Sequence, residues 1–126
     1  MSDILVVDDQ GVIRILVQEV LISMGHCVAQ ACSGIEAISN CRMYNYDLII
    51  LDYQMPDMNG LEVVQHLKQG TPFVLHTSDY NNKHIQLQAM RLGAMGVIAK
   101  ISGVSAFQRS ISPFLNQLES KQQVVY

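Results

Sequence analysis

Several short apolar runs in this chain are followed by polar side chains that can bind an ion or a phosphate. The runs have the length of a strand, and carboxylates, a hydroxyl and an ammonium follow four of them within two residues. In chain order, residues 4–7 precede Asp8 and Asp9, residues 48–51 precede Asp52, residues 73–75 precede Thr77 and Ser78, and residues 95–99 precede Lys100.

If the runs are parallel strands, their carboxyl ends meet at one edge of a sheet, where ligands of such sheets bind. Three carboxylates gathered there repel one another by about 4 kcal/mol per pair at about 4 Å and an effective dielectric near 20. Such a cluster must take up a proton or hold a cation. Mg²⁺ suits a site of oxygen ligands, because it keeps several waters and often completes its shell with a phosphate oxygen.

The same edge offers groups that could contact a phosphoryl group. Lys100 provides a point charge and Thr77 a hydroxyl donor. With its charge neutralised in this way, a phosphoryl group can be attacked by a carboxylate to give an aspartyl phosphate. Asp52, which follows the central run, is the expected nucleophile. Any one of these residues alone is more simply a helix cap, a turn former or a solvated side chain; their occurrence at four strand ends favours a site.

The elements that must position these residues are five apolar runs separated by helix-length segments. The runs are residues 4–7, 28–31, 48–51, 73–75 and 95–99, and the second is weak because it contains Gln30. The others are apolar on successive residues, as strands covered on both faces are. They predict an α/β fold, a (βα)5 doubly wound parallel sheet with helices on both faces. Helical apolar spacing is marked by Val12, Ile13, Leu16, Val20 and Leu21, by Ile35 and Ile38, by Leu61, Val63, Val64 and Leu67, by Ile85, Ala89, Met90 and Leu92, and by Val104, Phe107, Ile111, Phe114 and Leu118.

Two local signals refine this arrangement. Asn59 followed by Glu62 is typical of a helix N-terminus. Pro113 lies inside the last helical pattern, where proline costs about 3 kcal/mol, so we expect a kink or break near Ser112.

Composition limits the class of protein. The 126 residues are enough for one domain, 49% are hydrophobic and 15% charged, and the net charge of −3 argues against direct nucleic-acid binding. No apolar run is long enough to span a membrane, and Asp3 lies where a signal peptide needs positive charge, so we expect a cytoplasmic protein. Cys27, Cys32 and Cys41 fit neither a disulfide framework nor a zinc site, and we expect them to be buried as small hydrophobes.

Four stretches, "ILVVDDQ", "DLIILDYQMPDMNGLEVV", "VLHTS" and "GAMGVIAK", together resemble the receiver domain of bacterial two-component response regulators. The resemblance implies a receiver domain over residues 1–120 with a short tail at 121–126, and a flavodoxin-like sheet of order 2-1-3-4-5. It implies that Asp52 is the phosphoacceptor and that Asp8, Asp9, Asp52 and the backbone carbonyl of Gln54 bind Mg²⁺. Thr77 is the expected switch hydroxyl, and Lys100 and Thr77 the expected phosphoryl contacts.

The resemblance also implies partners. The segment "VDDQGVIRILVQEV" is similar to stand-alone phosphorelay receivers, so we expect phosphate to come from a sensor histidine kinase or a phosphotransfer protein. Few residues follow the last helix, which leaves either a downstream partner protein or an output domain in a longer chain to carry the signal. The face of the fourth helix, fifth strand and fifth helix is the expected contact surface, including for a homodimer, although its bases Lys83, Arg91 and Arg109 also fit a solvated face.

Several positions modify these expectations. Gln54 and Asp79, two residues beyond Asp52 and Thr77, are expected to tune the lifetime of the phosphoryl group. Val97 replaces the aromatic residue that usually swings inward with the threonine, and Ile101 replaces the usual proline after the lysine. Because a non-proline cis bond costs about 3–4 kcal/mol, we expect a trans Lys100–Ile101 peptide and a remodelled loop.

Two other functions remain open. A degenerate receiver would serve only as a binding module, which the changes at Val97 and Ile101 allow. A small phosphohydrolase with an aspartyl nucleophile usually carries a second aspartate two residues after the first, where this chain has Gln54. A nucleotide-binding module is disfavoured, because the phosphate-binding pattern GxxxxGK[ST] is absent.

Overall fold

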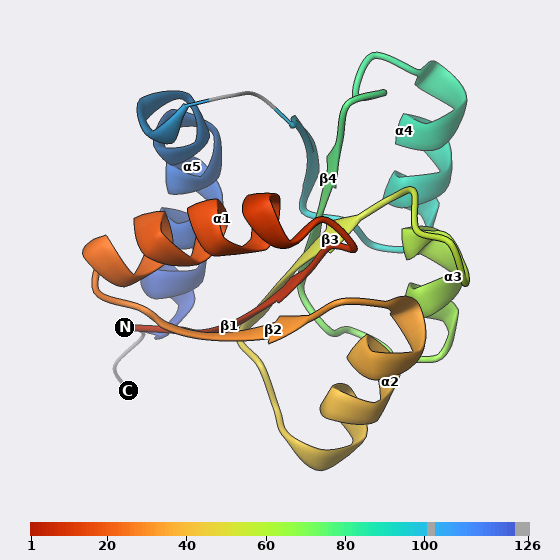
Figure 1. Cartoon of the computed structure of the whole chain (residues 1–126), viewed down its shortest axis with the longest axis horizontal. Coiled ribbons are helices and arrows are strands. Elements are labelled where there is room, and N and C mark those ends of the chain that lie inside the picture. The colour runs from red at the N-terminus through yellow and green to blue at the C-terminus, as the bar shows by residue number, and fades with distance from the viewer. Residues whose placement is uncertain (101–102, 123–126) are drawn as a thin grey trace.

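A computed structural model of the chain describes residues 1–100 and 103–122, which form a single parallel sheet flanked by helices. Figure 1 shows the strands crossing the middle of the molecule, in the order β2-β1-β3-β4-β5. The sheet is therefore the flavodoxin-like arrangement that the sequence predicts. Its strands are β1 (Asp3–Val7), β2 (Cys27–Ala31), β3 (Leu48–Asp52), β4 (Phe73–Thr77) and β5 (Gly96–Ala99).

Helices connect each strand to the next and cover both faces of the sheet. In Figure 1, α1 and α5 lie on one side of the strands, and α2, α3 and α4 on the other. A separate cluster of buried apolar side chains lies under each helical layer. The helices are α1 (Gly11–Ser23), α2 (Gly34–Met43), α3 (Gly60–Gln65), α4 (Lys83–Arg91) and α5 (Val104–Gln122).

The central strand β3 is buried at every position, including its final residue Asp52. It pairs with β1 on one side and with β4 on the other. A strand covered on both faces and both edges offers its last side chain only one direction toward solvent, beyond the carboxyl end. The continuous run "LIILD" thus places a carboxylate at the centre of the sheet edge.

Some apolar residues that mark the predicted helices lie on the outside. Val12, Ile35 and Met90 are 80%, 65% and 70% exposed. Each lies beside a residue of the same helix that is at least partly buried, and successive helical residues point about 100° apart, so both cannot face the core. The apolar spacing therefore located these helices correctly, but it did not identify which of the marking residues face the core.

The last helix does not break at Pro113. Helix α5 runs from Val104 to Gln122 with the proline inside it. Phe107, Ile111, Leu115 and Leu118 are buried along the same helix, on both sides of the proline. Burial on both sides keeps the helix continuous despite a cost of about 3 kcal/mol for an interior proline.

Other expectations meet mixed outcomes. Cys27, Cys32 and Cys41 are free, but Cys27 and Cys32 are exposed rather than buried; Cys27 begins the edge strand β2 and Cys32 directly follows it. Among the described residues, no helix is both long and apolar enough to cross a membrane. The predicted trans peptide between Lys100 and Ile101, with the loop that follows it, lies outside the described residues.

The start of α3 is tied to the end of β3. Asn59 caps the helix by accepting from the Glu62 amide, and the Glu62 side chain accepts from the Asn59 amide, as their spacing predicts. The next residue, Gly60, donates its N–H to the Tyr53 carbonyl at 2.8 Å. A Cβ atom on Gly60 would lie 2.3 Å from the carbonyl oxygen of Asp52, so only glycine permits this close approach.

Candidate functional site: an acidic cluster at the sheet edge

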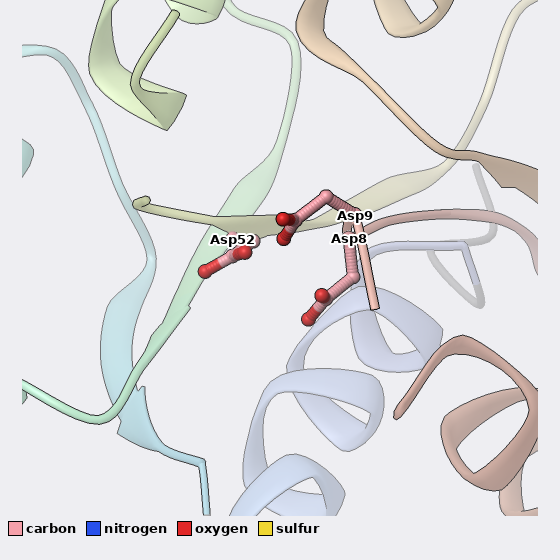
Figure 2. Close-up of side chains that lie close together, drawn as sticks. All are labelled: Asp8, Asp9 and Asp52. Atoms are coloured by element: carbon pink, nitrogen blue, oxygen red, sulfur yellow. The ribbon is translucent and has the colours of Figure 1, made fainter. Parts of the chain in front are cut away.

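Three carboxylates converge where β1 and β3 end. Asp8 and Asp9 follow β1, and Asp52 closes β3; one oxygen from each lies within 4.8 Å of the others. Figure 2 shows these side chains grouped at the strand ends. Asp8 and Asp52 are buried, with 1% and 2% exposure, whereas Asp9 is exposed. The sheet therefore brings together the acidic cluster that the spacing along the chain predicts.

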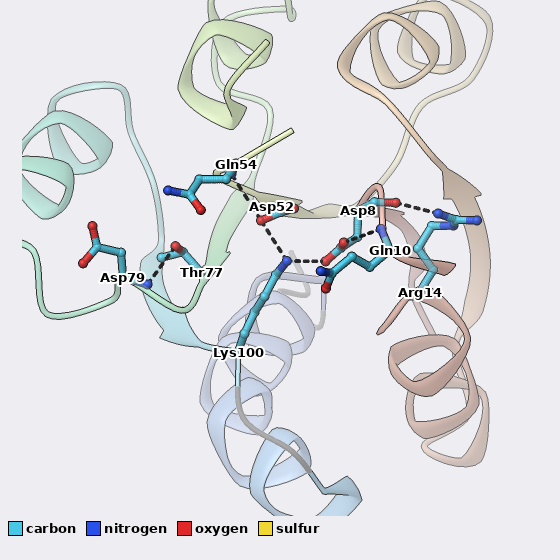
Figure 3. Close-up of polar contacts among 8 residues, drawn as sticks. All are labelled: Asp8, Gln10, Arg14, Asp52, Gln54, Thr77, Asp79 and Lys100. Atoms are coloured by element: carbon cyan, nitrogen blue, oxygen red, sulfur yellow. Dashed lines mark hydrogen bonds and ion pairs between the residues drawn. The ribbon is translucent and has the colours of Figure 1, made fainter. Parts of the chain in front are cut away.

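Lys100 bridges two of these carboxylates. Its Nζ lies 2.8 Å from Asp8 Oδ2 and 2.9 Å from Asp52 Oδ1. Figure 3 shows the lysine side chain extending from the end of β5 to a position between the two aspartates. These are the only ion pairs within the described part of the chain, and they are shielded from solvent. One cation thus faces two buried carboxylates and a third that is exposed.

The electrostatic balance leaves Asp52 poorly neutralised. The pKa of Asp52 is raised to about 6, mainly by burial and further by the charge of Asp8. The hydrogen bond from Lys100 opposes this and lowers the pKa. Burial lowers the pKa of Lys100, but its contacts with Asp8 and Asp52 outweigh this, so the net change is a rise. Lys100 remains an ammonium, whereas Asp52 ionises only at a cost.

Backbone groups fix the orientation of the two buried carboxylates. The Gln10 amide donates to Asp8 Oδ1 at 2.9 Å, and the Gln54 amide donates to Asp52 Oδ1 at 3.3 Å. The second oxygens differ: Asp8 Oδ2 contacts only Lys100, and Asp52 Oδ2 has no polar partner among the described residues. Two buried carboxylate oxygens are thus available to another ligand.

Arg14 supports the turn that carries Asp8, a role that the sequence analysis missed. Its Nη1 donates to the Asp8 backbone carbonyl at 2.7 Å, and its Nε donates to Gln30 Oε1 at 3.1 Å. Gln30 in β2 in turn donates to Gln18 Oε1 at 2.6 Å. This chain of contacts, seen in part in Figure 3, links α1, β2 and the acidic turn. No sequence pattern signals it, because the contacts depend on how β2 packs against α1, which the sequence alone does not give.

Thr77 and its neighbours lie on the other side of Lys100. Thr77 is buried, and its hydroxyl accepts from the Asp79 amide at 3.1 Å, leaving the hydroxyl proton free to donate. The Asp79 carboxylate is exposed and accepts from the Asn82 side chain. Val97 is part of β5 and packs into the core on the side of α2, α3 and α4, in register with Leu75 of β4.

A cavity of about 530 Å³ opens at the acidic cluster. Its polar lining includes Asp9, Asp52, Thr77 and Lys100, and the sequence analysis anticipated these. The cavity also reaches the apolar side chains of α1 and α5 and the imidazole of His76, which the sequence did not indicate as site residues. The full lining is Asp9, Gln10, Ile13, Leu16, Val17, Asp52, Gln54, His76, Thr77, Ser78, Lys100 and Phe107.

The donor set fits a divalent cation. The cluster presents only oxygen ligands, it has one lysine against three acids, and Asp52 Oδ2 is buried without a polar partner. Hard cations that prefer oxygen ligands, such as Mg²⁺, suit this set. A cation there would also favour the ionised form of Asp52, whose pKa is raised by burial and, to a lesser extent, by Asp8.

Comparison with known proteins agrees with this geometry. Residues 4–112 match the family described as the response regulator receiver domain. The chain belongs to this family. Receiver domains are typically phosphoacceptor signalling modules rather than enzymes, and they are partnered with histidine kinases or phosphotransfer proteins.

Relatives of this receiver domain include proteins of its own size and longer ones. It is 30% identical over 115 residues to the sporulation initiation phosphotransferase F of Bacillus subtilis, covering 89% of this chain and 92% of that one. It is 32% identical over 127 residues to a protein-glutamate methylesterase/protein-glutamine glutaminase of Methanococcoides burtonii, covering 97% of this chain but only 35% of that protein.

Among solved structures, the receiver domain resembles the response regulator TrrA of Thermotoga maritima, determined in complex with Mg²⁺ and BeF. The two share 31% identity and a TM-score of 0.80, over 94% of this chain and 99% of the other.

Proposed function

We propose that this receiver domain accepts a phosphoryl group on Asp52 in a Mg²⁺-dependent reaction and signals through protein–protein contacts. The observation that carries the proposal is the placement of Asp52 at the end of the central strand, with Lys100 at 2.9 Å and two further aspartates within 4.8 Å. The donor is a phosphohistidine on a sensor histidine kinase or a phosphotransfer protein.

In the transfer, the Asp52 carboxylate attacks phosphorus, and the bond between phosphorus and the donor imidazole nitrogen breaks. The electron pair of that bond stays on the imidazole. Asp8, Asp9, Asp52 and the backbone carbonyl of Gln54 would hold Mg²⁺, which when bound supplies positive charge to the phosphoryl oxygens. Asp52 loses its negative charge on becoming an acyl phosphate, which frees the Lys100 ammonium for a phosphoryl oxygen.

Thr77 is proposed as the switch. Its buried hydroxyl has an unused proton and lies in the same cavity as Asp52 and Lys100, so it can donate to the phosphoryl group. Val97 lacks a ring that could follow the threonine inward. The signal would therefore pass through the threonine loop and α4 to the face formed by α4, β5 and α5, where a downstream partner, a second copy or an attached output domain binds.

Gln54 and Asp79 are proposed to set the lifetime of the acyl phosphate. Gln54 lines the cavity beside Asp52, and Asp79 is exposed two residues beyond Thr77. Both lie where attacking water would approach. Exchanging either for alanine should change the half-life of the phosphorylated protein while leaving its formation intact, as measured by the decay of the phosphorylated mass after removal of the donor.

The test is phosphorylation by acetyl phosphate with Mg²⁺, followed by intact mass, with Asp52→Asn as the control. We expect one phosphate per chain that is lost at alkaline pH, requires Mg²⁺ and is absent from the Asn variant. Glu19→Gln, which removes an exposed acid on α1, should be phosphorylated normally.

Two other outcomes would point to the alternative functions. Rapid multiple turnover of acetyl phosphate would indicate a phosphohydrolase, against which Gln54 already argues. Failure to react with acetyl phosphate, together with no NMR response to beryllofluoride and Mg²⁺, would indicate a degenerate receiver that acts only as a binding module.

A further inference from the structure

The loop that joins β3 to α3, residues 53–59, contains Gln54, whose backbone carbonyl is the proposed fourth ligand of Mg²⁺. Its two ends are fixed by contacts close to the strand. The Gln54 amide donates to Asp52 Oδ1 at 3.3 Å. The Gly60 amide donates to the Tyr53 carbonyl at 2.8 Å. Gln54 is exposed, so burial of its own side chain does not fix the direction of its carbonyl, and the path of the loop matters instead.

Asp57, in the second half of this loop, ties it to the first turn of α2. Its Oδ1 accepts from the Gly34 amide at 3.2 Å, and its Oδ2 accepts from the Ile35 amide at 2.9 Å. These contacts, the one from Ile35 most of all, lower the pKa of Asp57. The positive end of the helix dipole also favours an ionised carboxylate at this place. One exposed side chain thus joins two separate segments through charge-assisted hydrogen bonds.

Helix α2 already has a cap from its own segment. Ser33 is the N-cap residue, and its side chain accepts from the Glu36 amide at 3.1 Å. Asp57 takes the two preceding amides of the turn. Met58 packs against the same turn, since a Cβ atom on Gly34 would overlap the Met58 Cγ. Figure 1 shows α2 and α3 on the same face of the sheet, with the loop before α3 close to the start of α2.

We propose that Asp57 is a positioning residue for the metal site, because it holds the loop so that the Gln54 carbonyl faces the acidic cluster. This role rests on the proposed function, since it concerns the Mg²⁺ that the phosphoryl transfer uses. The Asp57 carboxylate is taken up by the two α2 amides, so it acts through the loop and not as a ligand. Partners that orient a metal ligand by direct contact are worth about 10–100-fold in affinity. Asp57 acts through the backbone of the loop, so a smaller effect is expected.

Titration with MgCl₂, without phosphodonor and at about 0.15 M salt, measures this effect. The amide NMR signals of Asp9 and Gln54 follow binding. Asp57→Ala removes both contacts with α2 and should weaken Mg²⁺ binding about threefold to tenfold. Asp57→Asn keeps one acceptor oxygen, so its affinity should lie between those of the wild type and Asp57→Ala.

Two variants of α2 separate positioning of the loop from helix stability and from charge. Ser33→Ala removes the other cap of the same turn and should lower the thermal midpoint as Asp57→Ala does, by roughly 3–6 °C. Its Mg²⁺ affinity should stay that of the wild type. Glu36→Gln removes a negative charge from this turn and should change the affinity by less than about twofold. Circular dichroism verifies the fold of each variant.

Equal Mg²⁺ affinity in the wild type, Asp57→Asn and Asp57→Ala would overturn the positioning role and leave the proposed function intact. Equal losses of affinity in Asp57→Ala and Ser33→Ala would also overturn it, because the effect would then come from the stability of α2. A wild-type protein that binds no Mg²⁺ would overturn both this role and the proposed reaction. The asparagine variant retains most of the aspartate's shape, so it decides the question even if Asp57→Ala does not fold.

Discussion

Replacing Asp52 by asparagine should stabilise the metal-free protein. The charged carboxylate is 2% exposed, and burial raises its pKa to about 6 from an ordinary 3.8. A raised carboxyl pKa means that the fold resists ionisation, so the cost is fully present above pH 6 and disappears below pH 3.8. Linkage gives about 3 kcal/mol at pH 7 and about 1 kcal/mol at pH 4.5, at 1.36 kcal/mol per pKa unit.

Asparagine removes this cost because it keeps the shape of the side chain without the charge. Lys100 retains its contact with Asp8 at 2.8 Å, so the variant leaves no cation unpaired. The free energy of unfolding should therefore rise by about 1–3 kcal/mol at pH 7, and the gain should shrink steadily as the pH falls toward 4.

Urea unfolding in EDTA, followed by far-UV circular dichroism at several pH values between 4 and 7.5, measures the gain directly. Glu19→Gln is the matched control: it removes one negative charge from the exposed face of α1 and should change stability by less than about 0.5 kcal/mol. A gain that is as large at pH 4 as at pH 7, or a loss of stability at pH 7, would refute the argument that a buried charge dominates.

Three further outcomes follow from the same structure. Lys100→Met leaves Asp8 and Asp52 buried without a cation, so it should destabilise the fold by about 3 kcal/mol at pH 7, with partial recovery below pH 5; urea titrations at both pH values check this. Gly60→Ala forces a Cβ against the Asp52 carbonyl and should cost about 1–3 kcal/mol, measured as a lower thermal midpoint. The pKa of His76 is lowered to about 4 from 6.5, so His76 should remain neutral in NMR titrations down to pH 5, and its contribution to stability should be lost as the pH falls from 6.5 through 4. A normal titration near pH 6.5 would contradict this.

Much of the fold follows from a single property of the sequence. Strands that are apolar at successive positions must be covered on both faces, and β3 and β4 are buried throughout. The order of the strands came from the family resemblance and is confirmed by the structure. What periodicity could not decide is which of two adjacent apolar residues on a helix faces inward, as the exposure of Val12 and Met90 shows.

The candidate site, like the fold, could be predicted from the sequence only in part. Asp8, Asp52 and Lys100 could be predicted to meet, because parallel strands bring their carboxyl ends to one edge. The contacts of Arg14 and the burial of His76 could not be predicted, since they depend on how side chains of neighbouring elements pack in three dimensions. In the sequence, His76 directly follows the apolar run of residues 73–75 and precedes Thr77, and hydrophobic patterning alone does not show that a residue at this position is buried.

The contact of Arg14 with both the Asp8 carbonyl and Gln30 has a consequence for exchanging parts between receiver domains. Helix α1 and the edge strand β2 are joined by the Arg14 guanidinium and by the contact between Gln18 and Gln30, so they form a unit that should be transplanted together. A chimera that combines this α1 with a foreign β2 would lose the Gln30 contact and loosen the turn that carries the first two aspartates. Grafts of α1 between receiver domains should therefore carry residues 8–31 as one block.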